Sequence, residues 1–234
     1  MSAASVTIEW CGETLVLLHE RALWWPREET LLIADPHFGK AATFRLAGIP
    51  VPETSHDDDM KRLSGILAST GAPRLVILGD FLHARAGRST GVFSALAAWR
   101  ARHAAVEIVL VRGNHDRHAG PLPDEWGIAC VNGPWPLGRF HCRHEPWEDA
   151  AAPVLAGHVH PSLRLAGRGG LSLSAPCFHF AERVAVLPAF GTFTGNHAVK
   201  PGSGDRIILV GPDSLSEAPR HSPQFKQARA GKGV

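Results

Sequence analysis

The sequence predicts an α/β fold of two mixed sheets flanked by helices, arranged as a four-layer α/β/β/α sandwich. Three features support this prediction. Continuous Val/Ile/Leu runs end in polar residues at Asp35, Asp80 and Asp116, which is typical of central strands buried on both faces. Helical patterns occupy the intervening segments 53–69 and 90–102. Short strand-like pieces separated by Gly and Pro fill the second half of the chain.

The first half can be assigned element by element. Residues 6–10 and 14–19 are predicted to form a hairpin, because a Cys-Gly-Glu turn separates two strand-like segments. Acidic residues in its first turn and apolar residues at helical spacing, including Met60 and Leu63, indicate the helix at 53–69. Strand, helix, strand, helix, strand is the order expected of an α/β sheet.

The second half predicts a second sheet that is antiparallel or mixed. Its predicted strands are 127–131, 139–143, 154–156, 162–165, 170–174, 183–187 and 206–210. We expect residues 1–210 to form one domain, because the chain is long enough for a single substantial core. Residues 211–234 are rich in Pro, Ser, Gly and charge and are predicted to be a disordered tail.

The composition excludes several classes of protein. Apolar residues make up 44% and charged residues 20%, as in an ordinary globular protein. The net charge of +2 does not by itself indicate a nucleic-acid binder. The four cysteines are widely spaced and predict neither a disulfide framework nor a zinc knuckle. The sequence shows no signal-peptide pattern and no membrane-spanning apolar run, so we expect a cytoplasmic protein with no membrane partner.

The fourteen histidines include several that lie beside Asp, Asn and Gly at the ends of the predicted strands. The four clusters are Asp35-Pro36-His37, Gly79-Asp80, Gly113-Asn114-His115-Asp116 and Gly157-His158-Val159-His160. Ligand sites gather at strand ends in open α/β sheets, and oxygen and nitrogen donors without thiolate suit divalent first-row metals. Each cluster alone is explained equally well by a turn or a surface strand. Four in succession, each after an apolar strand, predict a metal site.

The series D-x-H, G-D, G-N-H-D and G-H-x-H resembles the signature of calcineurin-like metallophosphoesterases. The resemblance implies two divalent cations held by seven residues: Asp35, His37, Asp80, Asn114, His144, His158 and His160. Asp35, His37 and His160 would hold the first ion, Asn114, His144 and His158 the second, and Asp80 both. His144 fits the family's remaining histidine best because it follows the predicted strand 139–143, and His141 is the weaker candidate.

The same resemblance implies a hydrolase. His115 would face the substrate and stabilise the transition state or protonate the leaving oxygen, and Asp116 would orient it. A pair of metal ions supplies a water of lowered pKa and neutralises charge on the phosphoryl oxygens. Manganese is the expected metal, with iron or zinc as alternatives.

A narrower resemblance involves the N-terminal hairpin, DPHFGK, GDFLH at 79–83 and LPAFGTFTG at 187–195. These features resemble the bacterial DNA-ligase-associated metallophosphoesterases, a family of DNA-damage-response endonucleases. The resemblance implies a DNA phosphodiester substrate and an association with an ATP-dependent DNA ligase and a helicase. Four basic residues just beyond the metal-bearing loops are candidate phosphate contacts: Lys40, Arg85, Arg88 and Arg117.

Two other functions remain open at this stage. The chain is alternatively a phosphatase or pyrophosphatase that acts on a small nucleotide or a phosphoprotein, because the motifs concern only the phosphoryl group. It is alternatively a non-catalytic scaffold with this fold, although the complete motif set, with His115, argues against that reading. The sequence predicts neither the oligomeric state nor the strand preference.

Overall fold

The first sheet follows the predicted alternation of strands and helices. The computed structural model describes residues 4–49, 51, 55–166 and 172–219, and within them this sheet has seven strands in the order β1-β2-β3-β4-β5-β6-β7. Neighbours from β1 to β4 are antiparallel, and neighbours from β4 to β7 are parallel. The strands are β1 Ser5–Trp10, β2 Glu13–Leu18, β3 Ala22–Trp25, β4 Thr30–Ile33, β5 Arg74–Ile77, β6 Glu107–Val111 and β7 Ile128–Val131.

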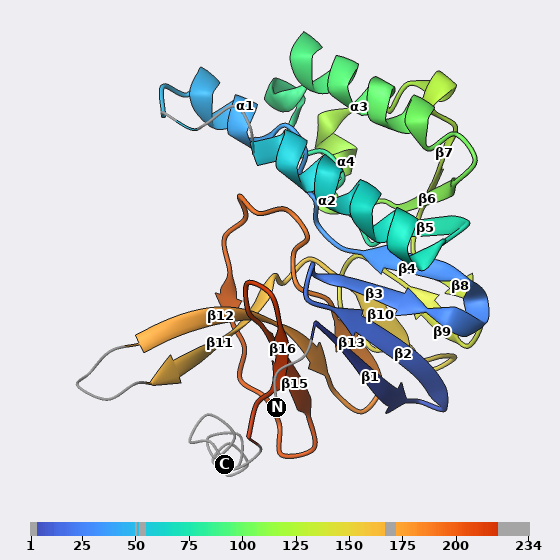
Figure 1. Cartoon of the computed structure of the whole chain (residues 1–234), viewed down its shortest axis with the longest axis vertical. Helices are drawn as coiled ribbons and strands as arrows, with labels where there is room; N and C mark the ends of the chain where they lie inside the picture. Colours follow the sequence, from blue (N-terminus) through green and yellow to red (C-terminus); the bar gives the residue numbers. More distant parts are fainter. Residues whose placement is uncertain (1–3, 50, 52–54, 167–171, 220–234) are drawn as a thin grey trace.

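Helices cover one face of this sheet (Figure 1). They are α1 Lys40–Leu46, α2 Ser55–Thr70, α3 Thr90–Arg102 and α4 Asn114–Ala119, with 3-10 turns η1 Pro26–Glu28, η2 Arg85–Gly87 and η3 Asp124–Trp126. Alternate residues of each strand, such as Ile33 of β4 and Ile77 of β5, form a core with Leu63 of α2 and Leu96 of α3. Successive strand residues point to opposite faces, so this alternation fixes which face the helices cover.

The second sheet lies against the other face of the first. Its nine strands within the described residues run in the order β14-β11-β12-β13-β10-β9-β8, with β15 paired to β12 and β16 to β15. They are β8 Trp135–Leu137, β9 Phe140–Cys142, β10 Val154–Ala156, β11 Pro161–Ala166, β12 Ser172–Phe180, β13 Val184–Val186, β14 His197–Ala198, β15 Arg206–Val210 and β16 Leu215–Glu217. Parallel pairs β9·β10 and β10·β13 make this sheet mixed.

Large aromatic side chains fill the space between the two sheets. Trp25 and Phe140 are fully buried, and their ring centroids lie 4.7 Å apart. Trp10 contacts Phe140 at 5.1 Å and Phe180 at 5.6 Å. Tilted and edge-to-face pairs of this kind bury much apolar area, so they join the sheets into one core.

The predicted α/β class with two mixed sheets and flanking helices is confirmed. The predicted layer order differs, because the α-helices of the described residues lie outside the first sheet only (Figure 1). The second sheet instead carries a small apolar cluster around Leu163, Cys177 and Ile207, on the face that does not pack against the first sheet.

The predicted tail begins too early. β16 pairs with β15 beyond Val210, and Leu215 and Ala218 are buried, so the ordered fold continues through this segment. A short hairpin turn at 211–214, rather than a chain end, explains its Pro, Ser and Gly content. Residues 220–234 lie outside the described residues, as do residues 170 and 171 of the predicted strand 170–174.

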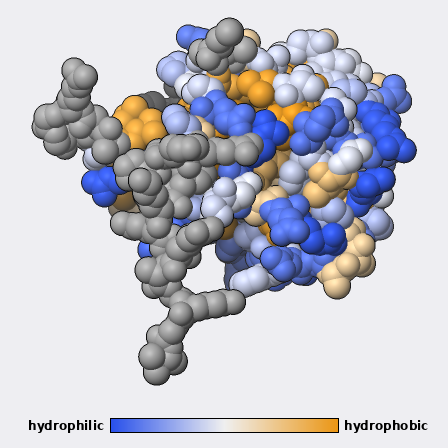
Figure 2. Space-filling view, turned by 90° about the horizontal axis from the view of Figure 1, so that it is seen from below, coloured by the Kyte–Doolittle hydropathy of each residue, from blue (hydrophilic) through white to orange (hydrophobic). Residues whose placement is uncertain are grey.

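The surface facing away from the helices is mixed in character. Seen from below, hydrophilic residues predominate over the visible described part and surround a hydrophobic strip (Figure 2). No helix in the described ranges is long and apolar enough to cross a membrane.

Candidate metal centre

Loops after five strands bring all seven predicted ligand residues to one edge of the paired sheets. Asp35 and His37 follow β4, Asp80 follows β5, and Asn114 begins α4 after β6. His144 follows β9, and His158 and His160 follow β10. The strands β4, β5 and β6 are parallel, as are β9 and β10, so their carboxyl ends converge.

The first group of donors consists of Asp35, His37 and His160. One ligand atom from each lies within 4.8 Å of the others. His37 Nε2 is 3.2 Å from His160 Nε2, which is 3.7 Å from Asp35 Oδ2. His160 Nδ1 lies 2.9 Å from the Gly195 carbonyl, which can only accept a hydrogen bond. The proton is therefore on Nδ1, and Nε2 presents its lone pair to the group.

The second group consists of Asp80, His144 and His158, joined by Asn114. His144 Nε2 is 2.9 Å from Asn114 Oδ1, 2.9 Å from His158 Nδ1 and 3.4 Å from Asp80 Oδ1. His144 Nδ1 faces the Leu78 carbonyl at 3.1 Å, which leaves the Nε2 lone pair for a ligand.

Asp80 lies between the two groups. Its Oδ1 is near His144 in the second group, and its Oδ2 is 3.7 Å from His37 Nε2 in the first. Each oxygen therefore faces a different set of imidazoles, which is the placement a bridging carboxylate requires. The backbone N–H of His115 also donates to Oδ1 at 3.0 Å and fixes the orientation of the carboxylate.

The charges of this centre fit a cation. Within the described part of the chain, Asp35 Oδ1 is buried and receives no hydrogen bond. Burial, with Asp80 adding to it, raises the pKa of Asp35 well above its usual range, and burial raises that of Asp80 to about 7. Burial lowers the pKa of His37 to about 2 and that of His144 to about 4. Neutral imidazoles beside crowded carboxyl groups favour a metal ion, because it supplies the missing positive charge.

The backbone of the ligand loops adopts an uncommon conformation. Five ligand residues have φ in the left-handed region: Asp35 at 50°, His37 at 48°, Asp80 at 52°, His158 at 71° and His160 at 50°. This conformation costs on the order of 1–2 kcal/mol for a residue with a Cβ and is concentrated at functional sites. The surrounding strands therefore hold the ligand side chains in directions that an unconstrained loop would not favour.

Comparison with known proteins identifies the family. The sequence profile of the family described as calcineurin-like phosphoesterase matches residues 29–180. The chain belongs to this family. No curated protein sequence matches the chain.

Two solved structures resemble this phosphoesterase. The first, a nuclease called MPE from Pseudomonas putida, has 42% sequence identity and a TM-score of 0.79, covering 91% of this chain and 100% of its own. It is consistent with the narrower resemblance to ligase-associated enzymes. The second, the Escherichia coli phosphoesterase Yfce, has 17% identity and a TM-score of 0.35, covering 82% of this chain and 93% of its own. At that TM-score it adds no argument.

His115, the residue predicted to face the substrate, lies beside the two candidate ligand groups of the phosphoesterase. Its side chain is 37% exposed, and its Nε2 lies 4.0 Å from Asp80 Oδ2. Its Nδ1 lies 2.5 Å from the carbonyl oxygen of His83 and therefore donates to it. The ring is held with Nε2 toward the centre, where it can contact a bound phosphoryl group.

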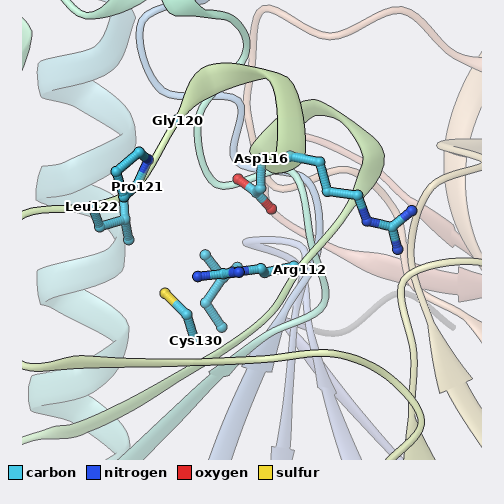
Figure 3. A pocket seen from close by; sticks show the side chains of 8 residues that line it. Arg112, Asp116, Gly120, Pro121, Leu122 and Cys130 are labelled. Carbon is cyan, nitrogen blue, oxygen red and sulfur yellow. The ribbon is translucent and has the colours of Figure 1, made fainter.

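The orienting role predicted for Asp116 is wrong. Asp116 Oδ1 accepts from the N–H of Leu82 at 3.1 Å, and Oδ2 accepts from the N–H of Gly113 at 2.9 Å. The carboxylate thus caps the first turn of α4 and ties it to the loop after β5. It also lines a cavity of about 220 Å³ with Arg112 and Cys130 (Figure 3). The His83 carbonyl orients the His115 ring instead.

His83 is a residue near the candidate centre that the sequence analysis did not single out. Its Nδ1 is 3.4 Å from His37 Nδ1, and its ring stacks on His115 at 4.9 Å. His37, His83 and His115 also place one nitrogen each within 4.8 Å of one another. The available signal was its position, three residues beyond Asp80 at the same strand end.

The four predicted phosphate contacts occupy different environments. Lys40, at the start of α1, adds to the effect of burial in lowering the pKa of His37, His83 and His160, so it lies near the centre. Arg85 and Arg117 are exposed. Arg88 donates to the carbonyls of Ala119 at 3.2 Å and Pro121 at 2.8 Å, and its guanidinium lies over Phe93. Arg88 therefore has a structural role that the sequence did not predict.

Gly79 is required for the second donor group. Its φ is 86°, and a Cβ there would meet the His144 ring, with His144 Cβ only 2.9 Å away. We expect Gly79→Ala to lower the free energy of unfolding by about 3 kcal/mol or more, from backbone strain and overpacking. It should also reduce metal content, as measured by denaturant unfolding and elemental analysis.

Gly65→Ala is the matched control for this substitution. Gly65 lies on the exposed side of α2, where an added Cβ would meet nothing within 4 Å. Alanine is the better helix former, so this variant should gain about 0.5–1 kcal/mol with unchanged metal content. If Gly79→Ala bound as much metal as the unmodified protein, His144 would not be a ligand.

Proposed function

We propose that this phosphoesterase is a phosphodiesterase that cleaves DNA with two divalent cations, manganese in the first instance. The observation that carries the proposal is Asp80, whose two oxygens face two different groups of imidazole and carboxylate donors. Asp35, His37 and His160 would hold one cation, and Asn114, His144 and His158 the other. When bound, such a pair supplies a nucleophilic water near neutral pH and neutralises charge on the phosphoryl oxygens.

The side chains around the centre have separate tasks in this proposal. His115, fixed by the His83 carbonyl, presents Nε2 to the phosphoryl group and donates a proton to it or to the leaving oxygen. Lys40 adds positive charge near His37, with which it lines a small pocket, and there it attracts the anionic substrate. Both tasks place protein donors where negative charge develops during hydrolysis.

Two observations support DNA as the substrate. The Pseudomonas putida protein named as a nuclease shares 42% of the sequence over 91% of this chain. The exposed Arg85 lies on η2, after the loop that carries Asp80, and the exposed Arg117 lies on α4, three residues beyond Asn114, so both can meet flanking phosphates. We extend the proposal to a role in DNA repair alongside an ATP-dependent DNA ligase and a helicase.

Substrate profiling of the purified protein with manganese tests this proposal. We expect hydrolysis of bis-p-nitrophenyl phosphate, little hydrolysis of p-nitrophenyl phosphate, and cleavage of DNA, all abolished by a chelator. Preference for the monoester without DNA cleavage would establish a phosphatase instead. Inactivity toward every substrate in a metal-loaded protein would favour a non-catalytic scaffold.

A further inference from the structure

A row of aromatic rings extends from the metal centre to the surface. His115 stacks on His83 with centroids 4.9 Å apart and planes 22° apart. His83 lies nearly parallel to Phe44 of α1 at 6.3 Å and 15°. Phe44 meets the edge of Phe193 at 5.5 Å and 82°. We call His115, His83, Phe44 and Phe193 the ring row.

The outer end of the ring row is apolar and open to solvent. Phe193 is 40% exposed, and Leu46 and Ile49 nearby in the chain after Phe44 are 72% and 47% exposed. Few large apolar side chains in the described residues are this exposed, and Leu46, Ile49 and Phe193 are three of them. The Phe193 ring is therefore accessible to a ligand from solvent.

Phe193 is held in place by the loop after β13, which rises toward α1 and α2 (Figure 1). The N–H of Thr192 donates to Asp59 of α2 at 3.1 Å. Two residues after Phe193, the Gly195 carbonyl accepts the hydrogen bond from the metal-ligand candidate His160 at 2.9 Å. The exposed ring is therefore positioned relative to the metal centre by contacts on both sides.

Positive charge lies beside the ring row. Lys40, His37 and Phe193 line the same small pocket, together with Thr194. The ammonium group of Lys40, which can bind a phosphate, and the apolar ring of Phe193 thus lie side by side. Both are next to the centre proposed to bind a phosphoryl group. A nucleotide combines the same two parts, an anionic phosphate and a flat base, separated by one sugar.

We infer that Phe193 and Phe44 form a stacking site for the nucleobase of a nucleotide adjoining the phosphodiester at the metal centre. The inference rests on the proposed function, because it requires a nucleic-acid strand at that centre. Aromatic side chains accept any base, since every base has a π-face, so this site confers a requirement for a base without a sequence preference. Lys40 holds the neighbouring phosphate.

The test compares DNA strands that differ by a single base. Each nucleotide around the cleavage position is replaced in turn by an abasic tetrahydrofuran, and kcat/KM is measured with manganese. For the unmodified protein, one abasic replacement should lower kcat/KM by about tenfold, the usual effect of losing one base–aromatic stack. Phe193→Leu should lose about the same factor on the intact strand and lose nothing more on that abasic strand.

Three further variants complete the design. Phe193→Trp retains an aromatic face and should keep near-normal kcat/KM on the intact strand. Phe44→Leu should reproduce the loss seen with Phe193→Leu. Leu173→Ala removes an exposed apolar side chain on β12, 66% exposed, and should change kcat/KM on neither the intact nor the abasic strand.

The possible results separate the two proposals. Equal losses by Phe193→Leu on intact and abasic strands, or no loss on either, would overturn the stacking site while leaving DNA cleavage established. A change of oligomeric state in Phe193→Leu, with an unchanged ratio between strands, would assign the surface to a second copy of the chain and overturn the inference. Failure of the unmodified protein to cut any strand would refute the DNA proposal, and the stacking site with it.

Discussion

Asp80→Asn is expected to abolish hydrolysis and to weaken the loading of both metal ions. The carboxylate offers one oxygen to each donor group, and its replacement by an amide removes both a negative charge and one anionic donor. We expect activity to fall by about 10³-fold or more, because both cations depend on this residue. Manganese content per chain, measured by elemental analysis, should fall with it.

Glu13→Gln provides the control for burial of a carboxylate. Glu13 is only 4% exposed and accepts from Trp25 Nε1 at 3.2 Å and from Arg27 at 2.8 Å, contacts that involve no ligand residue. This variant should lose stability by about 1–3 kcal/mol, since charged hydrogen bonds are weakened, with full metal content. Normal metal content in Asp80→Asn would refute the bridging arrangement.

His115→Ala is expected to separate turnover from metal binding. The imidazole is turned toward the centre by the His83 carbonyl, yet it belongs to neither of the two ligand groups. Turnover should fall by about 10²–10³-fold, the usual effect of removing a proton donor or an oxyanion contact. Metal content should stay at the level of the unmodified protein.

His118→Ala is the comparison within the same helix. His118 is exposed and its Nδ1 lies 2.7 Å from the Asn114 carbonyl, one turn along α4. Its removal should leave turnover within about twofold, because the His118 ring bonds the backbone carbonyl of Asn114 and not the side-chain oxygen that would bind a cation. Loss of metal from His115→Ala, but not from His118→Ala, would make His115 a ligand and remove its assigned role.

Much of the fold could be predicted because hydrophobic periodicity fixes strands and long helices. The helix expected at 90–102 is α3, and the helix expected at 53–69 is α2, which ends one residue later than expected, while residues 53 and 54 lie outside the described residues. The short helices were not predicted, because six or seven residues show too little periodicity. α4 begins inside the G-N-H-D motif and depends on the Asp116 cap, whose partner at Leu82 is distant in sequence.

The convergence of the candidate ligands at one sheet edge was predictable for a different reason. Parallel strands bring their carboxyl ends together, so short polar motifs after strands identify neighbours without any knowledge of distances. The choice of His144 over His141 agrees with the geometry, since His141 instead meets Asp149 at 2.7 Å. Side-chain direction could not be predicted, and this is why Asp116 was given the task that the His83 carbonyl performs. The ring row is likewise formed by residues from four segments that are distant in the sequence.

The left-handed main chain at five ligand positions determines how the centre is assembled. The strands on either side of these loops constrain the backbone that directs each donor side chain. Selection among divalent metals would then depend on the chemistry of the imidazole, carboxylate and amide donors and on cellular supply. The free energy gained by burying the two apolar cores behind the site offsets the cost of these backbone conformations.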